Sequence, residues 1–149
     1  MASEKPTEAP LLADAAIIRQ GVTRLARHMR SGRSAAALSI NKISVLSHLR
    51  SRGPSTPGEI ATADRQQPQS LTRVFAELTQ AGLIARTAAE DDRRQSIVSL
   101  TEAGLAALEQ DLAERDAWLA KAIADLSETE RGVLLLTARL MDRLVDRAP

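Results

Sequence analysis

The chain has 149 residues, a length that favours one domain with a real hydrophobic core. It contains no cysteine, which excludes disulfides, thiolate metal sites and thiol redox sensing. No signal peptide and no apolar run of membrane-spanning length are visible, so we expect a cytoplasmic protein without membrane contact.

The net charge is only +1, but the charged residues are unevenly distributed along the chain. Residues 15–58 contain eight Lys or Arg side chains and no acid, whereas residues 101–149 contain ten acids and six bases. Such a separation of charge favours a polyanionic partner on one side of the molecule. Arginines that only solvate helix faces are the alternative explanation.

Both ends of the chain have helical periodicity. The first ten residues, MASEKPTEAP, read as a disordered tail, and an apolar seam with steps of four and three residues follows them. The seam consists of Leu11, Ala15, Ile18, Val22, Leu25 and Met29. The last helix, expected after Ser127, is apolar on two sides, which is typical of a helix packed between two partners. Because few other elements could cover these faces, a homodimer is favoured over terminal helices that pack only on each other.

The middle of the chain predicts two helices joined by a tight turn. A helix near residues 40–50 ends in the turn SRGPST. In the following TPGE, Thr56 is a typical N-cap, Pro57 suits the first helical position and Glu59 completes a capping box. The stretch QQPQSLTRVFAEL then opens a second helix, which ends at Gly82. The pair is a helix-turn-helix candidate.

Residues 83–101 change from helical to strand-like patterning. Two short segments with β-branched residues, 83–87 and 96–101, flank the polar loop AAEDDRRQ and predict a β-hairpin. Thr101 is then placed to cap the next helix. The predicted fold is therefore mainly α with a small β-hairpin wing.

The second helix of the helix-turn-helix has one apolar and one polar face. At 3.6 residues per turn, Leu71, Phe75 and Leu78 lie within about 60° of one another and form the buried face. The opposite stripe consists of Gln66, Gln69, Ser70 and Arg73. Amide, hydroxyl and guanidinium groups of this kind read base edges in the major groove, although they are also common on ordinary solvated faces. Gln67 is a weak N-cap, so the first amides of this helix are left to meet a phosphate.

The hairpin tip, residues 90–95, contains three acids and two arginines. A tip of mixed charge normally faces solvent. Next to a recognition helix, however, an arginine at this tip could reach the minor groove, where the negative potential is enhanced. An acid could then hold one arginine by an ion pair and aim it.

Taken together, these residues resemble the MarR family of bacterial winged helix-turn-helix regulators, over about residues 11–146. The motifs that carry the resemblance are TPGEIA, PQSLTR, LTQAGLIAR, and DRR followed by SIVSLTEAG. The family has Asp-x-Arg in the wing, seven residues before the Thr of a Leu-Thr pair. Asp92 and Arg94 stand at these positions relative to Leu100 and Thr101.

The resemblance implies a winged helix-turn-helix domain with N- and C-terminal dimerisation helices. The expected organisation is a tail at 1–10 and a single domain at 11–146, in which 11–33 and 102–146 form the dimerisation helices and 39–101 the DNA-binding lobe. The resemblance also implies a transcriptional regulator, usually a repressor, that binds double-stranded DNA at a pseudo-palindromic site as a homodimer.

The resemblance carries DNA contacts over to particular positions. Residues expected in the major groove are Gln67, Gln69, Ser70, Thr72 and Arg73, and the helix wheel adds Gln66. Arg94, held by Asp92, is expected in the minor groove, with Arg93 close to a phosphate. Arg86, at the start of the wing, is expected near the DNA backbone.

The chain departs from the family at the corner of the helix-turn-helix, where Asp64-Arg65 replaces a common Leu-Gly pair. His28 and His48 are isolated from each other and from any cysteine, so no metal or cofactor is expected. The resemblance also implies a small anionic or aromatic ligand as a further partner, which the arginine-rich first helix or Trp118 could contact. A regulator without a ligand stays open.

Two other classes of function fit the sequence less well. An enzyme lacks support because the chain has no Cys, no Tyr and no cluster of His with acids at a catalytic spacing. A winged-helix adaptor for protein partners, without sequence-specific DNA binding, is the main alternative, and it predicts an apolar recognition face. RNA is disfavoured because single-strand recognition uses aromatic stacking, for which neither Phe75 nor Trp118 is placed.

Overall fold

The computed structural model describes residues 8–30, 37–88 and 96–147, which belong to two compact units. One unit comprises Gly32–Glu114, and the other comprises Met1–Ser31 together with Arg115–Pro149. Helix α5 (Glu102–Ala122) runs through the boundary between the two. Of the segment expected to be a tail, residues 1–7 lie outside the described residues.

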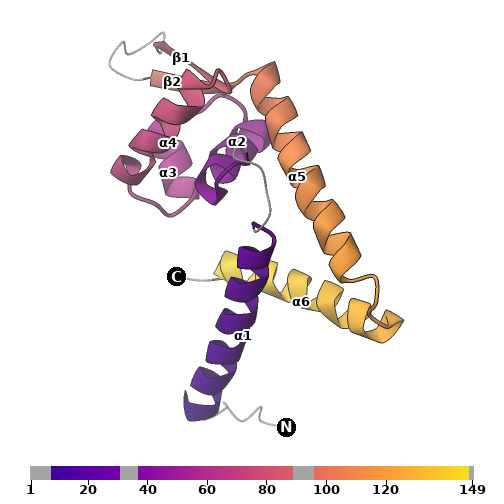
Figure 1. Cartoon of the computed structure of the whole chain (residues 1–149). Coiled ribbons are helices and arrows are strands. Elements are labelled where there is room, and N and C mark those ends of the chain that lie inside the picture. Colours follow the sequence, from indigo (N-terminus) through magenta and orange to yellow (C-terminus); the bar gives the residue numbers. More distant parts are fainter. Residues whose placement is uncertain (1–7, 31–36, 89–95, 148–149) are drawn as a thin grey trace. The chain divides into compact units, whose positions relative to one another are not determined.

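The unit Gly32–Glu114 has the winged helix-turn-helix arrangement (Figure 1). Its elements in chain order are α2 (Ile40–Arg52), α3 (Pro57–Ala63), α4 (Pro68–Gln80), β1 (Ile84–Ala88), β2 (Ser96–Leu100) and the first part of α5. The two strands are antiparallel, with Ile84 opposite Leu100 and Ala88 opposite Ser96. Ser55, between α2 and α3, adds an isolated bridge to Val98. The predicted mainly α fold with a hairpin wing is confirmed.

The hydrophobic core of this unit draws side chains from every one of its elements. The fully buried members with the largest side chains are Val45, Leu46, Ile60, Leu71, Phe75, Leu78, Val98 and Leu108. Leu71, Phe75 and Leu78 are the three that the helix wheel assigned to the buried face of α4. That prediction is confirmed. Because these three side chains are buried, the opposite face of α4 is left for solvent or a partner.

Asp111 of α5 is a buried acid at the edge of this core. Its Oδ1 accepts a hydrogen bond of 2.9 Å from the backbone N–H of Leu38, just before α2. This bond satisfies the backbone N–H of Leu38, which lies outside α2, and ties the chain before α2 to α5. The sequence pattern gave no sign of this contact, because the two residues are 73 positions apart.

The N-terminus of α3 has the capping box that TPGE predicts. The Thr56 hydroxyl accepts from the Glu59 N–H at 3.2 Å, and a Glu59 carboxylate oxygen accepts from the Thr56 N–H at 2.7 Å. The Thr56 hydroxyl also donates to the same carboxylate oxygen at 2.9 Å, and the two bonds that the carboxylate accepts, first from the Thr56 backbone and then from its hydroxyl, lower the pKa of Glu59 below its ordinary value. The box fixes where α3 begins, and therefore where α4 follows.

The corner between α3 and α4 is made by a residue other than glycine in the left-handed region. Arg65 has φ of 50°, and the Gln66 N–H then donates to the Ala61 carbonyl at 2.9 Å. A left-handed conformation costs less at glycine than at a residue with a Cβ, so Arg65 adopts it at some energetic cost. Asp64-Arg65, where the sequence departs from the family pattern, therefore still forms a corner.

Helix α5 begins against the backbone of the wing. The Thr101 hydroxyl accepts from the Gly104 N–H at 3.0 Å and donates to the Gly82 carbonyl at 2.7 Å. Gly104 approaches so closely that a Cβ there would lie 2.0 Å from the Leu83 carbonyl oxygen. Thr101 is the predicted cap, and Gly104 is the residue that lets α5 approach the chain between α4 and β1.

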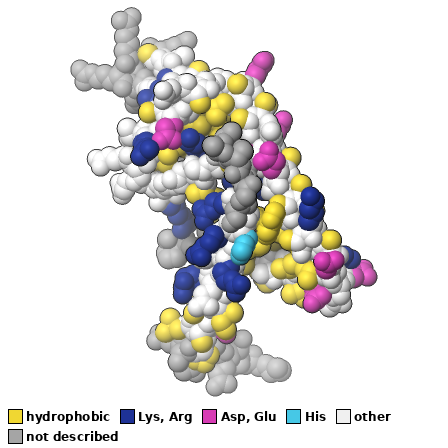
Figure 2. Space-filling model, in the orientation of Figure 1, with side chains coloured by type: hydrophobic (Ala, Val, Ile, Leu, Met, Phe, Trp, Pro, Cys, Tyr) yellow, Lys and Arg dark blue, Asp and Glu magenta, His cyan; other side chains and the backbone are white. Residues whose placement is uncertain are grey.

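The other unit contains the terminal helices α1 (Glu8–His28) and α6 (Glu128–Arg147) and the remainder of α5. Both terminal helices expose large apolar side chains, some of which are visible in Figure 2. On α1 these are Leu11, Leu12, Ile17, Ile18, Val22 and Leu25, and on α6 they are Val133, Leu134, Leu135, Leu136, Leu140, Leu144 and Val145. Among the described residues no helix is long and apolar enough to cross a membrane.

Candidate nucleic-acid interface

The exposed side of α4 carries the polar stripe, defined here as Gln67, Gln69, Ser70, Thr72 and Arg73. All five side chains are exposed, and the side chain of Arg73 is 90% accessible. The buried face of the same helix holds Leu71, Phe75 and Leu78, which fixes the rotation of α4 about its axis. Long polar groups thus project from one face of a helix whose opposite face is anchored in the core.

The N-terminus of α4 has no side-chain cap. Gln67 occupies the N-cap position with φ of −71° and ψ of 137°, and its side chain makes no capping hydrogen bond. Pro68 stands within the first turn, where its missing N–H has no helical partner to lose. The weak cap expected from the sequence is confirmed, and such an end of a helix favours an anion.

Gln66 differs from the stripe because α4 begins two residues after it, at Pro68. Its side chain is half-buried, and its amide nitrogen lies 2.8 Å from a carboxylate oxygen of Asp64 and 3.5 Å from the side-chain oxygen of Asn41. The helix wheel assumed that Gln66 already lies in the helix. In the structure Gln66 precedes the helix, and its side-chain amide makes hydrogen bonds at the corner between α3 and α4.

Arg73 is linked to the rest of the fold through Glu77. The Arg73 Nε lies 2.7 Å from Glu77 Oε1, and the Lys42 Nζ of α2 lies 2.9 Å from Glu77 Oε2. Lys42, and after it Arg73, lower the pKa of Glu77 below its ordinary value by hydrogen bonding to the charged form. Glu77 and Lys42 are not among the site residues that the sequence predicts. The four-residue spacing of Arg73 and Glu77 was a visible signal, whereas Lys42 is distant in the chain.

Arg86 lies on β1, opposite Val98 of β2, and is exposed. Its guanidinium carbon is 5.4 Å from the centroid of the Phe75 ring on α4. This cation–π contact connects the base of the wing to the recognition helix. Asp92, Arg93 and Arg94, the other predicted wing residues, lie outside the described residues.

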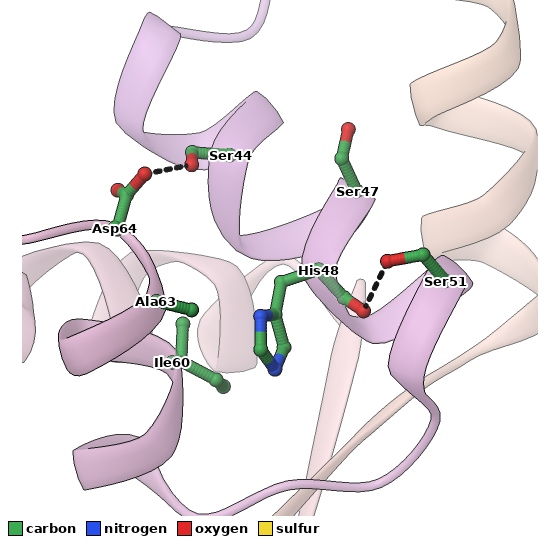
Figure 3. A pocket seen from close by; sticks show the side chains of 7 residues that line it. All are labelled: Ser44, Ser47, His48, Ser51, Ile60, Ala63 and Asp64. Atoms are coloured by element: carbon green, nitrogen blue, oxygen red, sulfur yellow. Dashed lines mark hydrogen bonds between the residues drawn. The ribbon is translucent and has the colours of Figure 1, made fainter. Parts of the chain in front are cut away.

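A cavity of about 230 Å³ lies between α2 and α3 (Figure 3). It is lined by Ser44, Ser47, His48, Ser51, Ile60, Ala63 and Asp64. The Ser44 hydroxyl donates to Asp64, and His48 Nε2 lies 3.2 Å from the Ser55 hydroxyl. These polar groups thus hold parts of the helix-turn-helix together. No group of three or more metal-ligating side chains occurs in the described part of the chain.

The second half of α1 carries a cluster of basic side chains (Figure 2). Arg19, Arg24 and Arg27 of this helix are exposed, as is His28 at its end. The sequence suggested this helix, together with Trp118, as the contact for an acidic ligand. Trp118 lies half-buried on α5.

Comparisons with known proteins extend these observations. The model of the MarR family matches residues 38–96. A helix-turn-helix-type transcriptional regulator from Mycobacterium tuberculosis is 37% identical over 128 residues, which are 86% of this chain and 90% of that protein. The transcriptional repressor MdtR of Bacillus subtilis is 35% identical over 104 residues, 70% of this chain and 65% of that protein. The solved structure of a MarR family protein from Bacillus stearothermophilus aligns with a TM-score of 0.78 and 19% identity, covering 96% of this chain and 100% of that one.

Proposed function

Because this chain belongs to the MarR family of DNA-binding transcriptional regulators, we propose that it binds a pseudo-palindromic operator as a homodimer and represses transcription there. The observation that carries the proposal is the polar stripe on α4, exposed immediately after a helix-turn-helix corner. An adaptor for protein partners would need an apolar surface at this place. The family is one of regulators and not of enzymes.

The polar stripe supports direct readout in the major groove. Gln69 can pair with adenine and Arg73 with guanine, each for about 1–3 kcal/mol of discrimination, while Ser70 is tolerant of either base. The uncapped N-terminus at Gln67 is suited to a phosphate. Thr72 completes this set of proposed contacts.

The wing supplies the remaining proposed contacts. We place Arg94 in the minor groove with Asp92 as its ion-pair partner, and Arg93 near a phosphate, by position in the family pattern. Arg86 already lies over Phe75, so its guanidinium is held at the junction of wing and recognition helix, where it can approach the DNA backbone.

Dimerisation is supported by the exposed apolar side chains of α1 and α6. Full burial of an exposed side chain of this size contributes at most roughly 1.5–3 kcal/mol, and thirteen such side chains on α1 and α6 are 40% to 71% exposed, so covering part of this apolar surface favours association. A second copy of the chain brings two recognition helices to one duplex, and their centres are expected about 34–36 Å apart.

A small anionic or aromatic ligand could release the DNA by preferring a dimer with a different spacing of its recognition helices. The exposed arginines of α1 make an anion the favoured class. We expect the regulator and its DNA in the cytoplasm.

Retention of the purified chain on random-sequence duplex DNA under a salt gradient tests the proposal. Binding through several phosphates weakens by about 10³- to 10⁵-fold between roughly 50 and 200 mM salt, so the chain should bind at low salt and elute in the gradient. Arg73→Ala should elute earlier, whereas Arg139→Gln on α6 should elute with the wild type. A wild-type chain that passes through the column at low salt would refute DNA binding.

A further inference from the structure

Glu77 uses its two carboxylate oxygens for two different cations. Oε1 lies 2.7 Å from Nε of Arg73, four residues earlier on α4, and Oε2 lies 2.9 Å from Nζ of Lys42 on α2. The carboxylate is partly accessible, with 38% of the side chain exposed, and Lys42 is more enclosed at 27%. Lys42 therefore fixes Glu77 to the scaffold, and Glu77 in turn fixes Arg73.

The stability of α4 does not explain this arrangement. An arginine that precedes a glutamate by four residues is the weaker order of a helical ion pair, because both charges oppose the helix dipole. Glu77 stands in the last turn of α4, where an acid is disfavoured. The ion pair with Lys42 of α2 offsets the unfavourable interaction of Glu77 with the helix dipole.

The contact also determines which donors of Arg73 remain for a partner. The guanidinium uses Nε for Glu77, so the two terminal nitrogens remain as a pair at the outer end of a side chain that is 90% accessible. Two parallel N–H donors match O6 and N7 of guanine in the major groove. The terminal pair is the end that projects furthest from the helix.

We propose that Glu77 is a positioning residue that holds Arg73 through Nε and presents its terminal nitrogens to a guanine in each half of the operator. The inference rests on the proposed DNA binding and adds the base class and the residue that sets it. Glu77 itself touches no DNA.

A held arginine binds with a smaller loss of side-chain freedom. Immobilising one rotamer-rich side chain at an interface costs an amount that corresponds to about a 2- to 12-fold change in affinity. If Glu77 has already restricted Arg73, its removal should weaken the discriminating contact by a factor in this range. If the negative charge at position 77 is kept, binding to unrelated DNA, where Arg73 makes no fixed pair, should change little.

Glu77→Asp is the decisive variant, because it keeps the negative charge but is one methylene shorter and cannot reach both cations. The measured quantity is the ratio of Kd for a scrambled duplex to Kd for a duplex selected by the wild-type protein. Arg73→Ala should lower this ratio by about 5- to 150-fold per half-site. Glu77→Asp should lower it by about 2- to 12-fold per half-site, with Kd for the scrambled duplex unchanged within about 2-fold.

The matched control is Glu109→Asp, the same change at an exposed position of α5, which should leave the ratio at its wild-type value. In an Arg73→Ala background, Glu77→Asp should have no further effect on the ratio, a coupling that a general loss of structure would not produce. Glu77→Gln is a second variant that keeps the shape of the side chain. It should lower the ratio and also tighten binding to the scrambled duplex, because an acid near phosphates is lost.

Three outcomes would overturn the inference. Glu77→Asp could keep the wild-type ratio although Arg73→Ala lowers it, or it could lower the ratio equally in the Arg73→Ala background. Either result leaves the proposed DNA binding intact. A wild-type protein that does not distinguish any selected duplex from its scrambled version would remove the proposed function and this inference together.

Discussion

Gln66 and Gln69 are chemically identical and three positions apart, but the structure gives them different surroundings. Gln66 is half-buried and donates to Asp64 at the corner, whereas Gln69 is exposed on α4. A side chain that is engaged within the fold contributes to stability, and an exposed one is available to a partner. The two residues should therefore respond differently to the same substitution.

Gln66→Ala should lower the free energy of unfolding by about 1 kcal/mol, because the Asp64 carboxylate loses a donor. Gln69→Ala should leave the free energy of unfolding within about 0.5 kcal/mol of wild type. It should reduce the difference in binding free energy between a selected and a scrambled duplex by about 1–3 kcal/mol. Urea unfolding and binding to a selected and a scrambled duplex measure the two effects. Loss of discrimination by Gln66→Ala, with none by Gln69→Ala, would show that the stripe begins before α4.

The first turn of α5 packs directly against the backbone of Leu83, which is possible only because Gly104 has no side chain. A Cβ there would lie 2.0 Å from the Leu83 carbonyl oxygen, and backbone cannot yield as a flexible side chain can. Gly104→Ala should therefore destabilise the protein by about 1–3 kcal/mol, although alanine is the better helix former.

The control is Gly132→Ala on α6, where no atom lies within 4 Å of the added Cβ. That substitution should instead stabilise the helix by about 1 kcal/mol. Thermal unfolding of the two variants beside the wild type distinguishes the effects. Equal stabilisation by both substitutions would refute the close approach of α5 to residue 83.

The capping box of α3 should make part of the stability depend on pH. The pKa of Glu59 in the folded protein is below the ordinary value of 4.5, so the stability that its carboxylate contributes is present above pH 4.5 and is lost as the pH falls through the folded pKa. Glu59→Gln should be less stable than wild type at about pH 7, and the difference should shrink at about pH 3. Urea midpoints at both pH values measure this. A difference that does not change with pH would exclude the charged carboxylate as the cause.

Local features of the sequence were sufficient to predict most elements. TPGE marked the start of α3, apolar spacing identified Leu71, Phe75 and Leu78 as buried, and Thr101 was recognised as a cap. These signals work because capping and periodicity involve residues within a few positions of one another.

The parts that the sequence did not reveal depend on distant residues. Lys42 of α2 forms an ion pair with Glu77 of α4. Asp111 accepts a hydrogen bond from the backbone N–H of Leu38, 73 positions away in the chain. Gln66 was placed on the helix wheel although α4 begins at Pro68, an error in where periodicity starts. Packing decides such contacts, and a pattern within one segment contains no information about them.

In the proposed dimer, two copies of the chain associate through α1 and α6. Leu136 of α6 is 57% exposed, and a charge there would have to be buried on association. Leu136→Glu should shift the dimer towards monomer and weaken operator binding, while Arg139→Gln, an equal change of charge on α6, should do neither.

Sedimentation at micromolar concentration measures this shift, and circular dichroism shows whether the helices persist. A Leu136→Glu protein that remains dimeric would place the interface elsewhere. A monomeric wild type would contradict the proposed assembly itself.

Selection of duplexes from a random pool by the purified wild-type protein shows whether two copies of α4 read one duplex. We expect an enriched motif of two inverted half-sites with centres about 10 base pairs apart, and a guanine in each half whose preference is lost in Arg73→Ala. Enrichment of no motif, or of a single half-site without symmetry, would contradict a dimer that reads DNA with two copies of α4.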